Sequence, residues 1–278
     1  NYNAAPQSQQ SFAVAKGDQT ITFTSTTPAS AKVGGPTYTV AATASSTLAV
    51  TFTIDATATS VCSISGSTVS FIGVGTCVID ANQAGNTNYN AAPQVQQSLL
   101  VAKGDQTITF TSTTPTSAKV GGPAYTVTAT ASSGLAVTFT VDATAASVCS
   151  ISGSAVSFIG VGTCVLDANQ AGNTNYNAAP QSQQSFAVAK GDQTITFTST
   201  SPANAKVGGA TYTVTATASS SLAVTLTVDA TSTSVCSISG STVSFIGVGT
   251  CAIDANQAGN ANYNAAPQSQ QSFAVAKG

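Results

Sequence analysis

The chain has 278 residues, of which only 6% are charged: seven lysines and nine aspartates give a formal net charge of −2. Because histidine is absent, the sequence lacks the base of Ser–His–Asp or Cys–His catalysis and the commonest metal ligand. Because arginine is absent and the lysines are scattered, it also lacks a basic patch that could bind nucleic acid. It also lacks an apolar run of transmembrane length. We therefore expect no enzyme activity, no cofactor, no metal, no nucleic-acid partner and no membrane insertion in this segment.

The first predicted element is a leader, residues 1–17, which matches residues 262–278 letter for letter. Tyr2, Tyr89, Tyr176 and Tyr263 are spaced 87 residues apart, so the leader corresponds to the closing strand of a preceding repeat. Since Asn1 falls within a repeat, we expect a mature protein or an internal piece of one. Three complete repeats follow the leader, at residues 18–104, 105–191 and 192–278. A repeat of this size is a whole domain.

Within the first repeat, apolar residues alternate with threonine, serine and alanine, which is typical of half-buried strands. A Ser-Gly-Ser turn at residues 65–67 predicts a hairpin. The predicted inward rows, in chain order, are Ile21 and Phe23; Tyr38, Val40, Ala42 and Ala44; Leu48, Val50, Phe52 and Ile54; Cys62 and Ile64; Val69 and Phe71; Cys77, Ile79 and Ala81; Leu99 and Val101. This pattern predicts about seven short strands per repeat and no helix.

Differences between the repeats support this alternation. Inward positions exchange only apolar residues, as at Ile54, Val141 and Val228. Outward positions exchange small and hydroxyl residues, as at Ala41 and Thr128. A slip of one residue would reverse that correlation. About seven antiparallel strands in 87 residues predict an all-β fold of tandem immunoglobulin-like β-sandwiches.

The succession DQTITFTS, VGGPTYTVAATASS, LAVTFTID, VCSISGSTVSFIGVGTC and QAGNTNYNAAP resembles bacterial Ig-like repeats of large secreted and surface-attached proteins. The resemblance covers all three repeats and the leader. It implies an extracellular or cell-surface protein in which such modules act as spacers, stalks or adhesin shafts. The chain departs from the antibody pattern, because it has no core tryptophan and its paired cysteines are only 15 residues apart.

Each repeat contains one pair of cysteines at the same spacing, and these pairs are Cys62 and Cys77, Cys149 and Cys164, and Cys236 and Cys251. Paired cysteines without other metal ligands predict a structural disulfide in an oxidising compartment. Two thiols without histidine cannot complete a zinc site within a repeat. Reduced buried thiols and bridges between chains are the alternatives.

The polar segment 80–90 partly resembles a calcium-binding loop. Asp80, Asn82 and Gly85 stand at positions one, three and six of such a loop, but Ala84 and Ala91 occupy positions five and twelve, where ligands are required. The sequence therefore favours a structured turn.

Lys32 and Lys103 are the candidates for an isopeptide bond, and Asp18, Asp55 and Asp80 are the candidates for an acid–base pair. Lys32 lies in a predicted loop and Lys103 in a predicted linker, and the aspartates have no recognisable pairing. We expect solvated residues in both cases.

Tyr89, Tyr176 and Tyr263 are the only aromatic residues in the polar loop of each repeat, and each could make a weak contact with a sugar ring. The preferred interpretation is that each ring folds beneath its own loop as an apolar plug.

The predicted linkers are short. Only six residues separate Val101 from Ile108, so we expect neighbouring repeats to lie end to end with restricted bending. The leader strand needs a partner, which is either an upstream repeat in a longer chain or a neighbouring subunit that accepts the strand. The first option is preferred, because residues 262–278 already complete the third repeat. The expected partners are copies of the module, arranged head to tail.

The sequence thus predicts a structural shaft of a bacterial surface filament, or an adhesin stalk. The alternative is a multivalent array that binds glycans or cells through one weak site per repeat.

Overall fold

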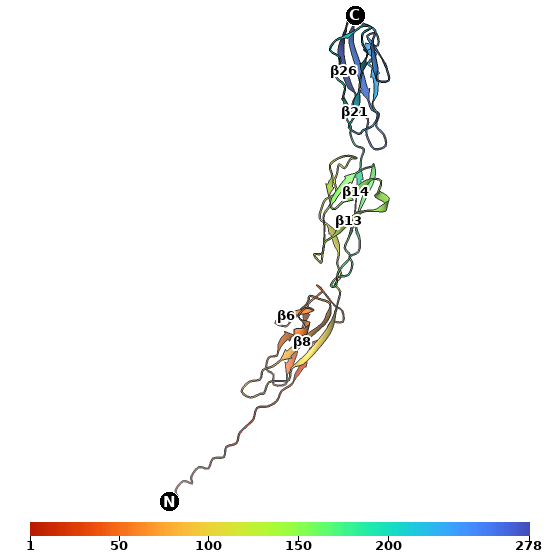
Figure 1. Ribbon diagram of the computed structural model, residues 1–278. Helices are drawn as coiled ribbons and strands as arrows, with labels where there is room; N and C mark the ends of the chain where they lie inside the picture. The colour runs from red at the N-terminus through yellow and green to blue at the C-terminus, as the bar shows by residue number, and fades with distance from the viewer. The chain divides into compact units, whose positions relative to one another are not determined.

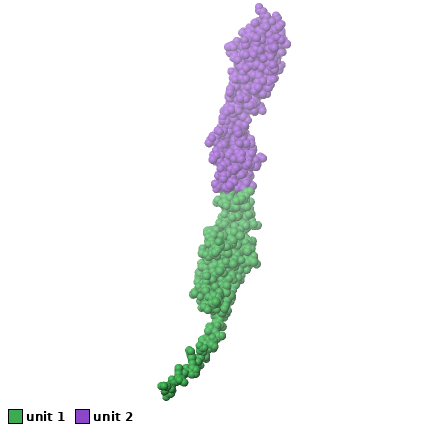
Figure 2. Space-filling model, turned by 90° about the vertical axis from the view of Figure 1, so that its left-hand side faces the viewer, with its two compact units in different colours: residues 1–108, 131–136, 170–180 green, residues 109–130, 137–169, 181–278 purple.

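The computed structural model describes all 278 residues, and its regular elements are strands apart from three short 3-10 turns (Figure 1). The residues group into two compact units (Figure 2). One contains residues 1–108, 131–136 and 170–180, and the other contains residues 109–130, 137–169 and 181–278. Because these units divide the second repeat, the predicted repeat boundaries stay a prediction.

The strands of the first repeat are β1 (Ile21–Phe23), β2 (Ala31–Lys32), β3 (Tyr38–Thr39), β4 (Ala42–Ala44), β5 (Thr51–Ile54), β6 (Cys62–Ser65), β7 (Thr68–Phe71), β8 (Gly75–Asn82) and β9 (Val95–Ala102). The 3-10 turn η1 (Ala56–Ala58) lies between β5 and β6. It begins at Asp55, whose side chain accepts a hydrogen bond from the backbone N–H of Thr57.

The second repeat contains β10 (Ile108–Phe110), β11 (Tyr125–Thr126), β12 (Ala129–Ala131), β13 (Thr138–Val141), η2 (Ala143–Ala145), β14 (Cys149–Ser152), β15 (Ala155–Phe158), β16 (Gly162–Asn169) and β17 (Ser182–Val188). The third contains β18 (Ile195–Phe197), β19 (Ala205–Lys206), β20 (Tyr212–Thr213), β21 (Ala216–Ala218), β22 (Thr225–Val228), η3 (Ala230–Ser232), β23 (Cys236–Ser239), β24 (Thr242–Phe245), β25 (Gly249–Asn256) and β26 (Ser269–Ala276).

The pairing of the strands gives each repeat two facing sheets. In the first repeat one sheet has the order β2-β9-β8-β5. The other has the order β3-β7-β6. Strand β4 follows β3 after two residues and continues it, and β1 extends this sheet by pairing with β4. This division matches the ABED and CFG sheets of immunoglobulin domains, with β2 added parallel to β9. The predicted all-β, immunoglobulin-like fold is confirmed.

The structure corrects the predicted strands in two respects. The parallel strand β2 was missed, because two residues are too few to show an alternating pattern. The predicted row that begins at Leu48 is a regular strand only from Thr51, although Leu48 and Val50 are half-buried. The hairpin of β6 and β7 is confirmed, with Cys62 opposite Phe71 and Ile64 opposite Val69.

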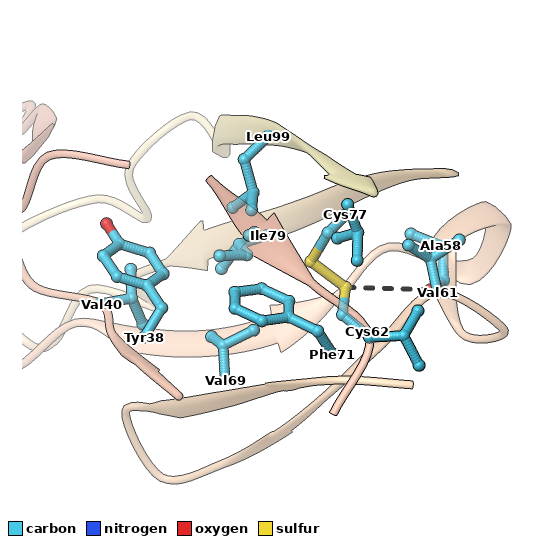
Figure 3. Close-up of a cluster of buried hydrophobic side chains, with 13 residues drawn as sticks. Tyr38, Val40, Ala58, Val61, Cys62, Val69, Phe71, Cys77, Ile79 and Leu99 are labelled. Atoms are coloured by element: carbon cyan, nitrogen blue, oxygen red, sulfur yellow. Dashed lines mark hydrogen bonds between the residues drawn. A yellow bond between two sulfur atoms is a disulfide. The ribbon is translucent and has the colours of Figure 1, made fainter. Parts of the chain in front are cut away.

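The core of the first repeat lies between the two sheets, where Val69, Phe71, Ile79 and Leu99 meet (Figure 3). Burying one such side chain contributes about 1.5–3 kcal/mol. Ser65 and Ser67, by contrast, point to the solvent in the turn of the hairpin. The second and third repeats place phenylalanine where the first has Leu99. Phe186 contacts Tyr125 edge-on, with 5.5 Å between the ring centroids.

The alternation is broken at Asp80 on β8, which was predicted to be a solvated residue at a strand end. It is only 7% exposed, and its carboxylate accepts a hydrogen bond of 2.8 Å from Gln96 on β9. The same amide of Gln96 lies 3.4 Å from the carboxylate of Asp55. The prediction was wrong because β8 is a central strand, in which Asp80 lies between Thr53 of β5 and Gln96 of β9.

Two adjacent leucines on β9 test the register. Leu99 is 6% exposed and Leu100 is 72% exposed. We expect Leu99→Ala to lower the free energy of unfolding of the first repeat by about 2–5 kcal/mol, because it leaves a cavity. Leu100→Ala, the matched control, changes it by no more than about 0.5 kcal/mol. Hydrogen exchange of the peptide 95–102, whose sequence is unique in the chain, measures both. Equal effects would contradict the register.

Candidate functional site

The cysteines of each repeat form a disulfide that joins its two sheets. Cys62 on β6 is bonded to Cys77 on β8, and their Cα atoms are 5.7 Å apart. The other two bonds join Cys149 to Cys164 and Cys236 to Cys251. All six cysteines are buried, and none is free. The bond encloses the hairpin of β6 and β7, and so fixes that hairpin to the centre of the opposite sheet.

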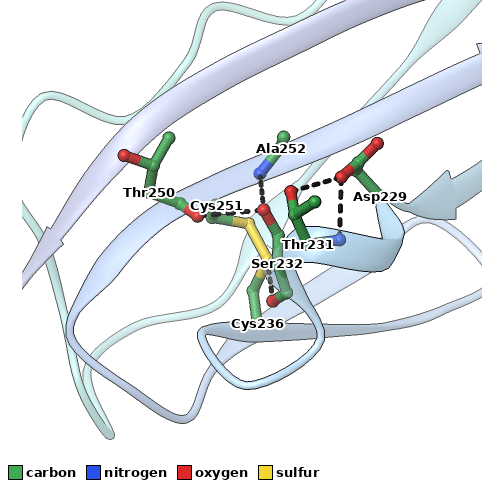
Figure 4. The surroundings of a disulfide bond; sticks show 7 residues. All are labelled: Asp229, Thr231, Ser232, Cys236, Thr250, Cys251 and Ala252. Carbon is green, nitrogen blue, oxygen red and sulfur yellow. Dashed lines mark hydrogen bonds between the residues drawn. A yellow bond between two sulfur atoms is a disulfide. The ribbon is translucent and has the colours of Figure 1, made fainter.

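The disulfide of the third repeat has a distinct polar neighbour (Figure 4). Ser232 replaces the alanine found at Ala58 and Ala145, and it is buried. Its hydroxyl donates to the carbonyl of Thr250 at 3.0 Å and accepts from the N–H of Ala252 at 3.1 Å. The serine therefore meets the hydrogen-bonding requirement of a buried polar group.

The polar loop that follows β8, β16 and β25 has a fixed conformation. We call residues 83–90, 170–177 and 257–264 the Asn-rich loops. In the second repeat, Asn173 Oδ1 accepts from the backbone N–H groups of Asn175 (2.8 Å) and Tyr176 (2.9 Å). Gly172 has φ +76°, and a Cβ there would lie 2.4 Å from the carbonyl oxygen of Tyr176. Only glycine fits this position.

A buried glutamine attaches each Asn-rich loop to the start of its own repeat. Gln106 is 3% exposed, and its amide donates to Gln170 Oε1 and to the carbonyl of Asn177, both at 2.7 Å. Ser133 donates to the oxygen of the same side chain. Alternation of apolar residues does not indicate a role for Gln106, and its place in the repeated Asp-Gln-Thr segment is the only sequence signal for it. These bonds position the loop at the end of the repeat that faces the linker.

The Asn-rich loop of one repeat packs on the preceding repeat, and we call this contact the joint. Tyr176 lies against the hydrophobic core of the first repeat. A Cβ at Gly34 would lie 3.2 Å from the Tyr176 hydroxyl, and a Cβ at Gly104 would lie 3.0 Å from its ring and 2.3 Å from the carbonyl oxygen of Val33. The ring thus fills space that glycine leaves open. The expectation that it folds beneath its own loop is corrected.

The linker backbone holds the loop in this position. The N–H of Gly104 donates to the carbonyl of Asn175, and the N–H of Asn177 donates to the carbonyl of Gly104, both at 2.9 Å. Asn175 Oδ1 accepts from the N–H of Val74 at 3.2 Å. Lys103 Nζ donates to the carbonyl of Asn173 at 2.7 Å.

An ion pair completes the joint. Lys32 Nζ lies 2.5 Å from Asp105 Oδ2, and Asn177 donates to the other carboxylate oxygen at 2.8 Å. The hydrogen bond from Lys32 lowers the pKa of Asp105 below its ordinary value, and the bond from Asn177 acts in the same direction. Both charged side chains are largely exposed, so the pair orients the joint more than it stabilises it.

The contacts recur between the second and third repeats. Tyr263 packs on the core of the second repeat, and its hydroxyl would lie 3.3 Å from a Cβ at Gly121. Lys119 Nζ lies 2.7 Å from Asp192 Oδ2. Lys190 Nζ donates to the carbonyl of Asn260 at 2.6 Å, and Asn262 Oδ1 accepts from the N–H of Val161 at 3.2 Å.

Positions without a joint have a different environment. Val33 and Val120 are buried beneath a joint, whereas the equivalent Val207 of the third repeat is half-buried. No atom lies within 4 Å of a Cβ built at Gly208. In the first repeat, the tip residue Asn88 is exposed, while Asn175 is half-buried. The joint therefore covers surface that is otherwise open.

The other candidates from the sequence lie apart from one another. Asp80 and Asn82 belong to strand β8 and are bonded to Gln96 and Gln94, so they do not converge with Gly85. No cluster of three histidine, cysteine, aspartate or glutamate side chains is placed to hold a metal ion. No helix in the structure has the length and apolarity needed to cross a bilayer.

No family model matches the chain, and no curated protein matches it in sequence. Among solved structures, it is similar to Drosophila N-cadherin EC1-4 at 11% identity, covering 94% of this chain and 76% of that one, with a TM-score of 0.29. Domains 1–6 of the surface layer protein SbsC match at 17% identity, with coverages of 93% and 40% and a TM-score of 0.29.

Sidekick-1 immunoglobulin domains 1–5 match at 11% identity, with coverages of 95% and 57% and a TM-score of 0.29. The chain thus spans less than two thirds of the surface-layer and Sidekick-1 fragments. At these TM-scores the similarities establish neither fold nor function, and the assignment of the fold rests on the sheet topology described above.

We expect Cys62→Ala/Cys77→Ala to lower the free energy of unfolding of the first repeat by about 3 kcal/mol, because the unfolded chain loses a covalent loop. Hydrogen exchange of the peptide 95–102 measures the change. The disulfides of the other two repeats remain as internal controls. A loss below about 1 kcal/mol would contradict a stabilising role.

We expect low pH to weaken the two joints, because it removes their ion pairs. Since the folded pKa of Asp105 and Asp192 lies below the ordinary value of 3.8, the ion pairs contribute fully above that pH and are lost as the pH falls below it. Small-angle scattering between about pH 5 and pH 2 should therefore show wider motion between repeats. The control is Asp105→Asn/Asp192→Asn, which should lack this response. An equal acid response in both proteins would contradict the prediction.

Proposed function

We propose that this chain is a structural, extracellular array of immunoglobulin-like modules, and that it forms part of the shaft of a bacterial surface filament or an adhesin stalk. The observation that carries the proposal is the joint, in which Tyr176 and Tyr263 each pack on the core of the preceding repeat. A flexible string of independent binding modules has no need of such a contact. The residues 18–104, 105–191 and 192–278 are the proposed modules, and residues 1–17 the closing strand of a preceding one.

Each part of the joint limits a different motion. The tyrosine ring between Gly34 and Gly104 resists tilting, because it occupies space on the preceding repeat. The backbone bonds between Gly104 and residues Asn175 and Asn177 leave the linker little freedom to rotate. The ion pair of Lys32 with Asp105 links a strand of one repeat to the start of the next. Together these contacts support a shaft that resists bending.

The disulfides support the location and the mechanical role. Disulfides persist in oxidising compartments, and three buried bonds in a weakly charged chain are consistent with secretion. When a repeat is stretched, the residues between Cys62 and Cys77 stay inside the covalent loop, so the repeat releases less chain.

The alternative of a glycan-binding or cell-binding array has less support. It relied on three equivalent tyrosines, and the joints engage Tyr176 and Tyr263 with the preceding repeats. Tyr89 lies 3.4 Å from the position of a Cβ at Gly17 in the leader. A weak ligand contact at these residues stays a prediction.

The test compares two proteins by small-angle scattering and by electron microscopy of single molecules. Tyr176→Ala/Tyr263→Ala removes two half-buried rings. Each ring stabilises its closed joint by on the order of 1–2 kcal/mol, so open joints should become about tenfold more populated. The angles between neighbouring repeats should then spread. Tyr89→Ala is the matched control, since it removes the same ring from a loop without a preceding complete repeat. Equal angular spread in the two proteins would overturn the proposal.

A further inference from the structure

One side of each β-sandwich ends in a strand that has no neighbour. Strand β5 pairs only with β8, and its equivalents β13 and β22 also stand at the edges of their sheets. The N–H of Asp55, directly after β5, donates to a carbonyl of β8. Alternate residues of an antiparallel strand bond to the same side, so Thr53 also faces β8. The backbone groups of Phe52 and Ile54 therefore point away from the sheet, and no other part of the chain bonds to them.

This open edge lacks the features that usually keep the strands of different molecules from pairing. Such features are proline, lysine, a bulge or a very short strand. The opposite edge of the same sheet has two of them, because β2 contains only two residues and one is Lys32. Strand β5 has four residues (TFTI), and none is charged or proline. The equivalent strands β13 (TFTV) and β22 (TLTV) are also uncharged, so every repeat presents the same edge.

A groove lies beside the open edge. It measures about 370 Å³ and is lined by Val50 and Phe52 on one side and by Ile64 of the β6–β7 hairpin on the other. The equivalent residues of the second repeat line a groove of about 450 Å³. Phe52 and Ile54 are half-buried and contact the core, whereas Thr53 is exposed on the outer face. A strand that pairs with β5 can therefore place its alternate apolar side chains on the side of the groove.

We propose that the open edge binds the same edge of a second copy of this chain, through antiparallel pairing of β5 with β5 or with its equivalents. In the register that uses all the free groups of β5, Thr53 of one copy lies opposite Thr53 of the other. Phe52 of each copy then lies opposite Ile54 of the other, and the free N–H and C=O groups of these residues bond to one another. Pairs of aromatic with β-branched side chains, and of threonine with threonine, stabilise such contacts.

Charge favours a second copy as the partner. Asp55 follows β5 directly, and in this register it falls opposite Thr51 of the other copy. The carboxylates of the two Asp55 residues are then separated by four residues along the strands, or about 13 Å. The whole chain carries a net charge of only −2, so two copies repel each other weakly.

Repetition favours the same partner. One pairing of this length is small beside the roughly 1,200 Å² that a stable interface buries, so each contact is weak. A second copy presents the edge once in every repeat, and additional pairings between the same two chains strengthen their association. This inference goes beyond the proposed function, because it concerns contacts between chains. Its test leaves the joints unchanged, so either proposal can fail alone.

The test uses the full chain and places charges at Thr51 and its equivalents, which are exposed. Thr51→Glu/Thr138→Glu/Thr225→Glu puts a negative charge opposite Asp55, or its equivalent, of the other copy. Thr51→Lys/Thr138→Lys/Thr225→Lys puts a positive charge at the same places. The first variant should therefore weaken the pairing, and the second should strengthen it.

The matched controls carry the same charges at exposed positions of central strands. Thr68→Glu/Ala155→Glu/Thr242→Glu and the corresponding lysine variant alter β7, β15 and β24, each of which has a neighbour on both sides. These controls change the net charge as the edge variants do, but leave the open edge as it is. Sedimentation equilibrium up to about 1 mM protein measures association. Hydrogen exchange of the peptide 48–55, whose sequence is unique in the chain, reports on the free N–H groups of β5.

We expect the average mass of the unmodified chain to rise with concentration, while exchange of the peptide 48–55 slows. The glutamate variant should associate at least about threefold more weakly and the lysine variant at least about threefold more tightly, with both controls close to the unmodified chain. The inference is overturned if the unmodified chain stays monomeric over this range, or if the two edge variants shift the dissociation constant in the same direction. It is also overturned if the controls shift it as much, or if the chain associates without slower exchange of this peptide.

Discussion

The close approach of a tyrosine ring to a glycine backbone is the contact on which both joints depend. At Gly104 and Gly191 a Cβ would collide with the ring and with a carbonyl oxygen of the preceding repeat. Glycine at the linker and tyrosine in the loop are therefore required together. The loop that carries the ring is also bonded around it: Asn175 accepts from the N–H of Val74, Asn177 donates to Asp105, and the carbonyl of Asn173 accepts from Lys103.

The low charge of the chain is compatible with this arrangement. Within a repeat, structure is held by apolar burial, by the disulfide and by uncharged hydrogen bonds such as those of Gln106. Charged residues are used mainly where repeats meet, in the pairs of Lys32 with Asp105 and of Lys119 with Asp192. Two sets of aspartates lie elsewhere: Asp80 and its equivalents are buried and bonded to glutamine, and Asp55 and its equivalents begin the 3-10 turns.

Much of the fold could be predicted from the sequence, because alternation of apolar residues reports directly on which face of a strand is buried. Ile79, Val69 and Val101 are buried as that pattern requires. The parallel strand β2 could not be predicted, since two residues carry no period. The joint could not be predicted either. A tyrosine that packs on its own loop and one that packs on the preceding repeat have the same sequence neighbours, and only the three-dimensional path of the linker separates them.

The parallel pairing of β2 with β9 has a consequence for load. Ala31 and Lys32 lie beside Val101 and Ala102, so the early and the last strands of the repeat run in the same direction. A force that pulls the two ends of the repeat apart slides these strands along each other, and it strains their hydrogen bonds simultaneously. An antiparallel hairpin pulled at its open end breaks its bonds one after another. The two-residue strand β2, which the sequence pattern did not reveal, is therefore placed where it resists extension of the whole repeat by being loaded in shear.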